Sequence, residues 1–232
     1  MNCYFCSSIP EPSGLAVLDE PESRHAATAR RQQAGDRVLL IDGRGRRARG
    51  VIVSITRRSA EIEIECVSYV GKRKPLIILA CAIAKGDRQK VVLDMATQLG
   101  IDEYVPLNCE RSVVKPNARS IERWLRVCTE ACKQSHNPYL PRISPAETPD
   151  SLATRMKRAY IPLVVAQAGG ASTSSVIRTD AVVICIGPEG GFSDTEKMQL
   201  ADSGARFLSL GQNILRIETA AVAAVSTFRM SS

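Results

Sequence analysis

The sequence predicts an α/β fold built on a parallel sheet. The segment Ala181–Ile186 is uniformly apolar and rich in β-branched residues, which is typical of a strand buried on both faces. Residues 76–84 form a second run of this kind, and a helical pattern follows each run. Strands that alternate with helices pair in parallel, because each helix carries the chain back across the sheet.

Composition fits a globular protein of one large or two small domains. The chain has 232 residues, of which 44% are apolar and 4% aromatic. Its longest apolar run, residues 76–84, is much shorter than the ~20 residues that a membrane helix needs, and the first residues lack the pattern of a signal peptide. We therefore expect a cytoplasmic protein with no membrane partner.

The eight cysteines are irregularly spaced, so we expect free thiols rather than a disulfide framework. Cys3 and Cys6 match half of a zinc site, but no second pair lies nearby and the chain has only two histidines. The sequence therefore predicts no metal site.

Residues 1–70 are expected to form a small β-domain. Strand patterns cover residues 37–41, 48–55 and 60–66, and a turn at residues 42–45 joins the first two. Residues 24–58 contain ten arginines and two aspartates, an excess of eight beside a net charge of +7 for the whole chain. This arginine-rich segment is either an RNA-binding surface, because guanidinium groups match phosphate oxygens, or a solvated surface.

A basic, helix-breaking linker at residues 71–75 precedes the second domain, residues 75–232. Asp87 is expected to cap a helix that Gly100 ends, and Trp124 is expected to lie in the core. The apolar face of the first of these helices is predicted to contain Val91, Val92, Met95, Ala96 and Leu99. A strand is expected near residues 161–166, followed by a flexible loop at residues 169–175.

Two loops follow strands of the predicted sheet. They read Ile-Gly-Pro-Glu-Gly-Gly-Phe at residues 186–192 and Leu-Gly-Gln-Asn-Ile-Leu-Arg-Ile-Glu-Thr-Ala-Ala at residues 210–221. Parallel sheets bind ligands at the carboxyl ends of their strands, where glycine lets the backbone approach a ligand closely. No Walker loop and no Gly-x-Gly-x-x-Gly motif is present, so spacing alone leaves nucleotides, phosphates and a structural turn open.

The two loops closely resemble those of the RsmE family of ribosomal RNA methyltransferases, which belongs to the SPOUT superfamily. Supporting motifs in the family's order are Lys-Gly-Asp at residues 85–87, Glu-Arg-Ser at 110–112 and Glu-Ala-x-x-Gln-Ser at 130–135. The resemblance implies a SPOUT-type parallel sheet with a C-terminal trefoil knot, plus an N-terminal PUA-like or OB-like β-barrel that binds RNA.

The activity implied by the resemblance is methylation of N3 of a specific uridine in 16S small-subunit ribosomal RNA, with S-adenosyl-L-methionine as cofactor. The substrate is expected within an assembled 30S subunit. The Ala-rich final helix is expected to pair two copies of the chain into a homodimer.

The resemblance also assigns site residues. The expected cofactor contacts are Ile186, Gly187, Pro188, Glu189, Gly190, Gly191, Leu210, Gly211, Ile214, Leu215, Arg216, Thr219 and Ala220. The expected RNA contacts are Arg24, His25, Arg30, Arg31, Arg44, Arg46, Arg47, Lys85 and Arg111. His25 is equally well explained as a packed histidine of the barrel.

Arg216 is the expected catalytic cation, because uridine N3 must lose a proton and a positive charge stabilises the resulting anion. Glu189 and Glu218 are the candidate bases. In the alternative, these carboxylates cap backbone amides or pair with Arg216, which then only braces its loop.

Three functions remain open. They are a methyltransferase, an RNA-binding protein without chemistry, and a small-ligand enzyme whose basic domain is incidental. Both loops are intact, which favours the methyltransferase. A ribose 2′-hydroxyl, as in other SPOUT enzymes, is the alternative methyl acceptor.

Overall fold

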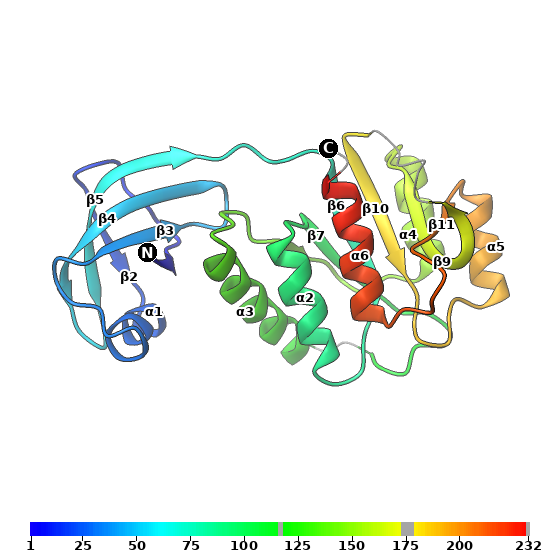
Figure 1. Ribbon diagram of the computed structural model, residues 1–232, viewed down its shortest axis with the longest axis horizontal. Coiled ribbons are helices and arrows are strands. Elements are labelled where there is room, and N and C mark those ends of the chain that lie inside the picture. The colour runs from blue at the N-terminus through cyan, green and yellow to red at the C-terminus, as the bar shows by residue number, and fades with distance from the viewer. Residues whose placement is uncertain (116–117, 173–178, 231–232) are drawn as a thin grey trace. The chain divides into compact units, whose positions relative to one another are not determined.

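A computed structural model describes residues 1–115, 118–172 and 179–230 of the chain. It forms two compact units, Met1–Lys72 with Thr129–Leu140, and Arg73–Cys128 with Pro141–Ser232 (Figure 1). Residues 129–140 fall within the expected second domain but pack into the first unit. Among the helices described, none is long and apolar enough to cross a membrane.

The first unit is built on a five-stranded sheet with the order β1-β3-β4-β5-β2. Its elements are β1 (Asn2–Phe5), β2 (Leu15–Leu18), α1 (Glu20–Arg24), the π-helical turn η1 (His25–Ala29), β3 (Arg37–Ile41), β4 (Arg46–Ile55) and β5 (Ala60–Tyr69). The three predicted strands are confirmed, with β4 and β5 longer than expected. Register shifts between β4 and β5 bend this sheet, since an extra residue in one strand increases its local twist.

Residues 129–140 are fastened to the first unit by polar contacts. Lys133 Nζ donates to Glu22 Oε1 at 2.6 Å, and both side chains are buried. The Tyr139 hydroxyl donates to the carbonyl of Val70 at 2.5 Å, and the Gly45 amide donates to the carbonyl of Pro138 at 3.0 Å. This segment is therefore a structural part of the first unit.

The second unit contains a six-stranded, all-parallel sheet with the order β11-β9-β10-β6-β7-β8. Its strands are β6 (Leu76–Ala82), β7 (Glu103–Leu107), β8 (Arg142–Ile143), β9 (Leu163–Ser172), β10 (Ala181–Ile186) and β11 (Arg206–Ser209). The helices are α2 (Arg88–Gln98), α3 (Ala118–Ser135, shared with the first unit), α4 (Pro149–Arg158), α5 (Asp194–Asp202) and α6 (Ile217–Met230). The predicted α/β fold with a parallel sheet is confirmed.

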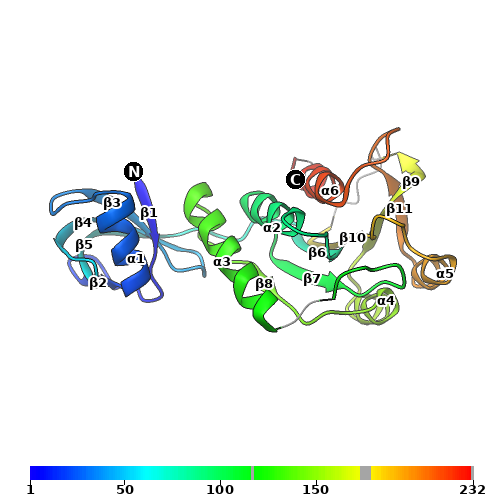
Figure 2. The ribbon, with the colours of Figure 1, turned by 90° about the horizontal axis from the view of Figure 1, so that it is seen from below.

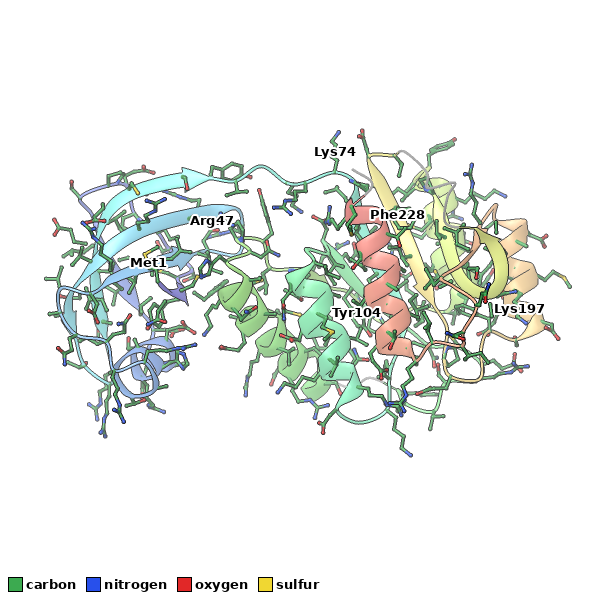
Figure 3. The ribbon with its side chains drawn as sticks, viewed as in Figure 1. Met1, Arg47, Lys74, Tyr104, Lys197 and Phe228 are labelled. Atoms are coloured by element: carbon green, nitrogen blue, oxygen red, sulfur yellow. The ribbon has the colours of Figure 1, made fainter. Side chains whose placement is uncertain are left out.

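Helices cover both faces of this sheet. Helices α2 and α6 pack against each other on one face, and α4 and α5 lie together on the other (Figure 2). Side chains of β6 and β10 are buried on both faces, which explains why both strands read as continuous apolar runs. Tyr104 of β7, labelled in Figure 3, is fully buried and lies edge-on to Trp124, so the prediction that Trp124 is a core residue is confirmed.

The prediction of a loop at residues 169–175 is wrong for its first part, because β9 continues to Ser172; residues 173–175 lie outside the described residues. Glycine is needed here inside a strand. A Cβ on Gly170 would lie 2.8 Å from the carbonyl carbon of Leu208, because the backbone of β11 approaches closely at a register shift. Composition alone cannot distinguish such a glycine from one in a loop.

The predicted apolar face of α2 is partly wrong. Val92 and Ala96 are buried, but Val91 and Met95 are 36% and 45% exposed. Asp87 occupies the expected cap position, although its side chain accepts no hydrogen bond there. Helix α2 therefore presents apolar side chains to solvent on the face of the sheet that it shares with α6.

Candidate functional site

The two predicted loops line one cavity of about 350 Å³ at the carboxyl edge of the sheet. The first loop follows β10 and the second connects β11 to α6. Ten residues of the expected cofactor set line this cavity: Ile186, Gly187, Pro188, Glu189, Gly191, Leu210, Gly211, Ile214, Leu215 and Ala220. Gly190, Arg216 and Thr219, which were expected beside them, are exposed and are not part of its lining. The volume is within the range of small-molecule and cofactor sites.

The floor of the cavity comes from β9, a strand that the sequence predicted without indicating that it lines the site. Strand β9 lies between β10 and β11, so the loops that follow its two neighbours flank its end. Ala166, Gln167 and Ala168 line the cavity from this position. Their contribution depends on strand order, which a single sequence does not reveal. Phe192, Lys197, Asn213 and Ile217 complete the lining, and of these only Lys197 lies outside the two loop motifs that the sequence indicated.

The glycine-rich loop is held by specific contacts. The Gly191 amide donates to the carbonyl of Pro188 at 2.8 Å, and Gly191 has a φ of +69°, which favours glycine. A Cβ on Gly187 would lie 3.0 Å from the ring of buried Phe192. Arg111 donates to the carbonyl of Gly190 at 2.8 Å. Arg111, expected as an RNA contact, thus also braces this loop.

Helix α5 begins with a capping box, and its glutamate makes a further contact. Ser193 Oγ accepts from the Glu196 amide, and Glu196 Oε2 accepts from the Ser193 amide at 2.8 Å. Glu196 Oε1 also accepts from the amide of Glu110 at 2.8 Å. The start of α5 is therefore joined to the loop after β7.

Two ionisable side chains of opposite charge line the cavity, Glu189 and Lys197. Glu189 pairs with Arg88 at 3.4 Å, and Lys197, labelled in Figure 3, pairs with Asp194 on its own helix at 3.2 Å. All four side chains are partly or largely exposed. Such pairs contribute little to stability, so both charges can exchange these partners for a ligand at low cost.

Arg216 is exposed and, among the residues that the structure describes, forms no ion pair. Glu218 Oε2 is buried and has no hydrogen-bond partner in the same described ranges. Burial raises the pKa of the Cys81 thiol well above its usual range, and the charges of Glu189 and Glu218 raise it further. Both carboxylates thus lie near the carboxyl end of β6, and the neutral thiol supplies no nucleophile.

A second hollow of about 240 Å³ lies at the end of β6, beside the start of α2. Its lining includes three cations, Lys90, Lys115 and Arg123, and one carboxylate, Asp87. Lys85 is exposed in the adjoining loop. Cations outnumber carboxylates here, so this hollow favours an anionic partner.

The expected RNA contacts of the first unit occupy two segments. Around α1 and η1, Arg24 pairs with Glu20, Arg30 and Arg31 are exposed, and the ring of His25 lies edge-on to Tyr4 at 6.3 Å. Packing against Tyr4 supports the structural interpretation of His25.

The second segment is the turn before β4. Asp42 Oδ1 accepts from the amides of Arg44 and Arg46 at 2.7 and 3.0 Å, which holds the predicted turn. The Arg44 side chain is 73% exposed, whereas Arg46 pairs with Glu11 at 2.8 Å. Arg47, labelled in Figure 3, is partly buried and donates to the carbonyl of His136. The Arg47 side chain therefore contacts residues 129–140, whereas the Arg44 side chain donates to the carbonyl of Ser7 at 2.6 Å.

All eight cysteines are free, as predicted. Burial raises the pKa of Cys3 to about 12, so this thiol is neutral at physiological pH. Within the described part of the chain, no cluster of three or more His, Cys, Asp or Glu side chains is arranged to hold a metal ion.

Two family models match the chain, an RNA methyltransferase domain over residues 72–229 and an RNA methyltransferase PUA domain over residues 18–65. These matches define the class as an RNA methyltransferase, and the parallel sheet, the paired loops and the edge cavity agree with it. The chain belongs to the family of this RNA methyltransferase domain, and its resemblance to the RsmE proteins is confirmed.

Individual relatives extend over nearly the whole chain. The ribosomal RNA small subunit methyltransferase E of Bacillus subtilis is 27% identical over 245 residues, which cover 97% of this chain and 95% of that protein. Its namesake from Rickettsia conorii is 29% identical over 238 residues, 98% of this chain and 94% of that protein. A crystal structure of the Neisseria gonorrhoeae enzyme of the same name, bound to S-adenosyl methionine, has a TM-score of 0.91 at 26% identity, covering 100% of this chain and 98% of that chain.

Proposed function

We propose that this protein transfers a methyl group from S-adenosyl-L-methionine to N3 of a specific uridine in 16S small-subunit ribosomal RNA. The observation that carries the proposal is the cavity that both family loops line at the carboxyl edge of the sheet. Its lining fits the cofactor. A mostly apolar wall suits the adenosine, and one carboxylate and one ammonium group match the charges of the amino-acid end.

The chemistry of the chain's own residues follows from their charges. When bound, the cofactor supplies an electrophilic methyl carbon on its sulfonium group. Uridine N3 attacks only after its proton leaves, and Glu218, whose buried Oε2 has no hydrogen-bond partner among the described residues, is the proposed acceptor of that proton. Glu189 is already paired with Arg88. Arg216 stabilises the anion that then forms on the uracil ring.

Calorimetry with purified protein tests cofactor binding. S-adenosyl-L-methionine and its demethylated product should both bind. A chelator should leave the affinity for each ligand unchanged. Absence of binding at millimolar ligand would reject the methyltransferase and leave an RNA-binding protein.

Mass spectrometry of ribosomal RNA from cells lacking the protein then identifies the acceptor. Missing N3-methyluridine supports the base, and a missing ribose methyl group supports the 2′-hydroxyl.

The proposal includes two features of the fold. The bent sheet of the first unit is proposed to be a PUA-like barrel that binds RNA, within a domain of residues 1–70. Residues 75–232 are proposed to form the SPOUT domain. A C-terminal trefoil knot is supported by the path of the chain. After β11, at the edge of the sheet, α6 packs across β10 and β6.

RNA binding by the first unit is expected to depend on the turn before β4. The backbone of Arg44 bridges to Tyr139, but its side chain is largely exposed, and the Arg46 side chain pairs with exposed Glu11, whereas β5 carries Glu61, Glu63 and Glu65 on its outward positions. Phosphate is repelled by that acidic strand, so we expect the RNA to approach the arginine turn. The substrate is an assembled 30S subunit or its RNA.

Reversing Arg44 and Arg46 to glutamate should weaken RNA binding and lower the slope of log affinity against log salt by about two, because roughly one counterion is released per phosphate contact. Arg57→Glu with Arg58→Glu is the matched control. It has the same change in charge at the exposed β4–β5 turn. Cofactor affinity should be unchanged in both. If the two double variants bind RNA with equal affinity, the arginine turn is a solvated surface and not the RNA-binding site.

We also propose a homodimer paired through α6 and the neighbouring α2. Both helices lie on one face of the sheet, and Val91 and Met95 of α2 are exposed there. Met95→Glu should convert a dimer into the 25.2 kDa monomer in sedimentation at micromolar concentration. Met198→Glu is the control, because Met198 is 65% exposed on α5, which covers the opposite face. A wild-type monomer would contradict the proposal.

A further inference from the structure

Gln167 carries a buried hydrogen-bond acceptor that no residue in the described part of the chain satisfies. Its Oε1 is inaccessible to solvent and has no partner there, and Gln167 lines the cavity between the two loops. Buried polar atoms are nearly always hydrogen-bonded, because an unpaired one loses its bonds to water without replacement. An orphaned oxygen in the wall of a ligand cavity indicates that the ligand supplies the missing donor.

The position of Gln167 is fixed by the sheet. Ala166 of β9 is in register with Ile186 of β10, so Gln167 follows directly beside the start of the glycine-rich loop. On its other side, β9 pairs with β11 at Val164 and Val165 and again from Ala171, so Gln167 lies in the irregular stretch between these pairs, where Gly170 lets the β11 backbone approach closely. Gln167 therefore lies on a strand rather than on a mobile loop, which suits a residue that selects a ligand group.

The charged lining residues indicate which end of the ligand meets Gln167. The side chains of Glu189 and Lys197 are 43% and 38% exposed, so the charged amino-acid end is expected near them, where water remains. Burying a charge costs far more than burying a neutral group. The neutral nucleoside end, with its ribose hydroxyls and adenine amino group, is left for the buried oxygen.

We propose that Gln167 is a specificity-determining residue that accepts a hydrogen bond from the nucleoside part of the cofactor. This inference rests on the proposed function. It names a contact that neither loop motif contains, made by the strand that separates the two loops. The donor is an N–H or O–H group, either the adenine amino group or a ribose hydroxyl.

Gln167→Met tests the inference, because methionine keeps the length of the side chain and removes the acceptor. Two results are expected, one for ligand affinity and one for the stability of the ligand-free protein. Affinity for S-adenosylhomocysteine should fall roughly tenfold, and the melting temperature of the ligand-free protein should stay equal or rise, since an unsatisfied buried oxygen is gone. Gln199→Met, at an exposed position of α5, should change neither quantity.

Analogues identify the donor. S-adenosylhomocysteine lacking the 6-amino group, the 2′-hydroxyl or the 3′-hydroxyl should each bind the wild type less well. The analogue that binds wild type and Gln167→Met equally lacks the group that Gln167 recognises. If wild type binds S-adenosylhomocysteine but Gln167→Met binds it with the same affinity, the inference is wrong. A lower melting temperature together with lower affinity would also overturn it, by making Gln167 a structural residue. Failure of the wild type to bind any of these ligands would instead overturn the proposed function.

Discussion

Replacing Arg216 with alanine is expected to slow methyl transfer by roughly a hundredfold or more while cofactor and RNA affinities stay nearly unchanged. This magnitude corresponds to the loss of one preorganised donor that stabilises charge in the transition state. Arg216 is exposed, and in the described part of the chain it pairs with neither Glu189 nor Glu218. Its charge is therefore available for the uracil anion. Single-turnover kinetics, with affinities measured separately, check the expectation.

Two further variants sharpen the Arg216 experiment. Arg216→Lys should recover little activity, because an ammonium group cannot reproduce the two-pronged geometry of a guanidinium. Arg206→Ala removes an exposed arginine from β11 and should leave turnover intact. If cofactor affinity and turnover fall together in Arg216→Ala, the residue braces its loop and the anion is stabilised elsewhere.

The two candidate carboxylates differ in their surroundings. Glu189 has an ion-pair partner, Arg88, and lines the cavity, whereas Glu218 has a buried, unpaired oxygen and is not part of the lining. A base must be free to accept a proton, and a residue that holds a ligand must face it. We therefore propose Glu218 for proton transfer and Glu189 for holding the cofactor.

The cavity loops could be predicted from sequence because local signals determine them. The apolar run of β10 has the predicted bounds, and the capping box of α5 depends on residues three apart. Strand β9 could not be bounded in this way. Glycines 169 and 170 suggested a loop, and only the close approach of β11 explains a glycine within the strand. Gln167 was missed for the same reason, since strand order is a long-range property.

The arginine-rich segment shows a similar limit. Composition treats Arg44, Arg46 and Arg47 alike, yet their side chains have three different sets of partners. The partner of Arg47, the carbonyl of His136, lies 89 residues away in sequence. The packing of residues 129–140 into the first unit depends on such distant pairs, so no local pattern indicated it.

One pair of residues that are distant in sequence, Lys133 and Glu22, holds residues 129–140 to the first unit. Lys133 Nζ lies 2.6 Å from Glu22 Oε1 and 2.7 Å from Glu130, and Glu22 Oε2 accepts from the Phe5 amide at 3.1 Å. The Lys133 side chain is only 6% exposed. Burial acts to lower the pKa of Lys133, but the hydrogen bonds to Glu130 and Glu22 outweigh it and raise the pKa overall.

Glu22→Ala is expected to destabilise the first unit by about 3–5 kcal/mol, because it leaves the buried ammonium of Lys133 without its buried partner. Glu20→Ala is the control. It breaks an exposed pair with Arg24 on the same short helix and should cost at most about 1 kcal/mol. Chemical denaturation of the full chain measures both.

The double variant Glu22→Gln with Lys133→Met separates pairing from packing. It removes both charges, so it should be more stable than Glu22→Ala.

The pH dependence of stability has a definite sign. Because folding raises the pKa of Lys133, the contribution of its charge is complete below the ordinary lysine value of 10.5 and is lost as the pH rises through the folded pKa. Wild-type stability should therefore fall faster than that of the double variant above this pH. Equal stability of Glu22→Ala and Glu20→Ala at neutral pH would mean that Lys133 reaches water or Glu130 without Glu22, and that other contacts hold residues 129–140.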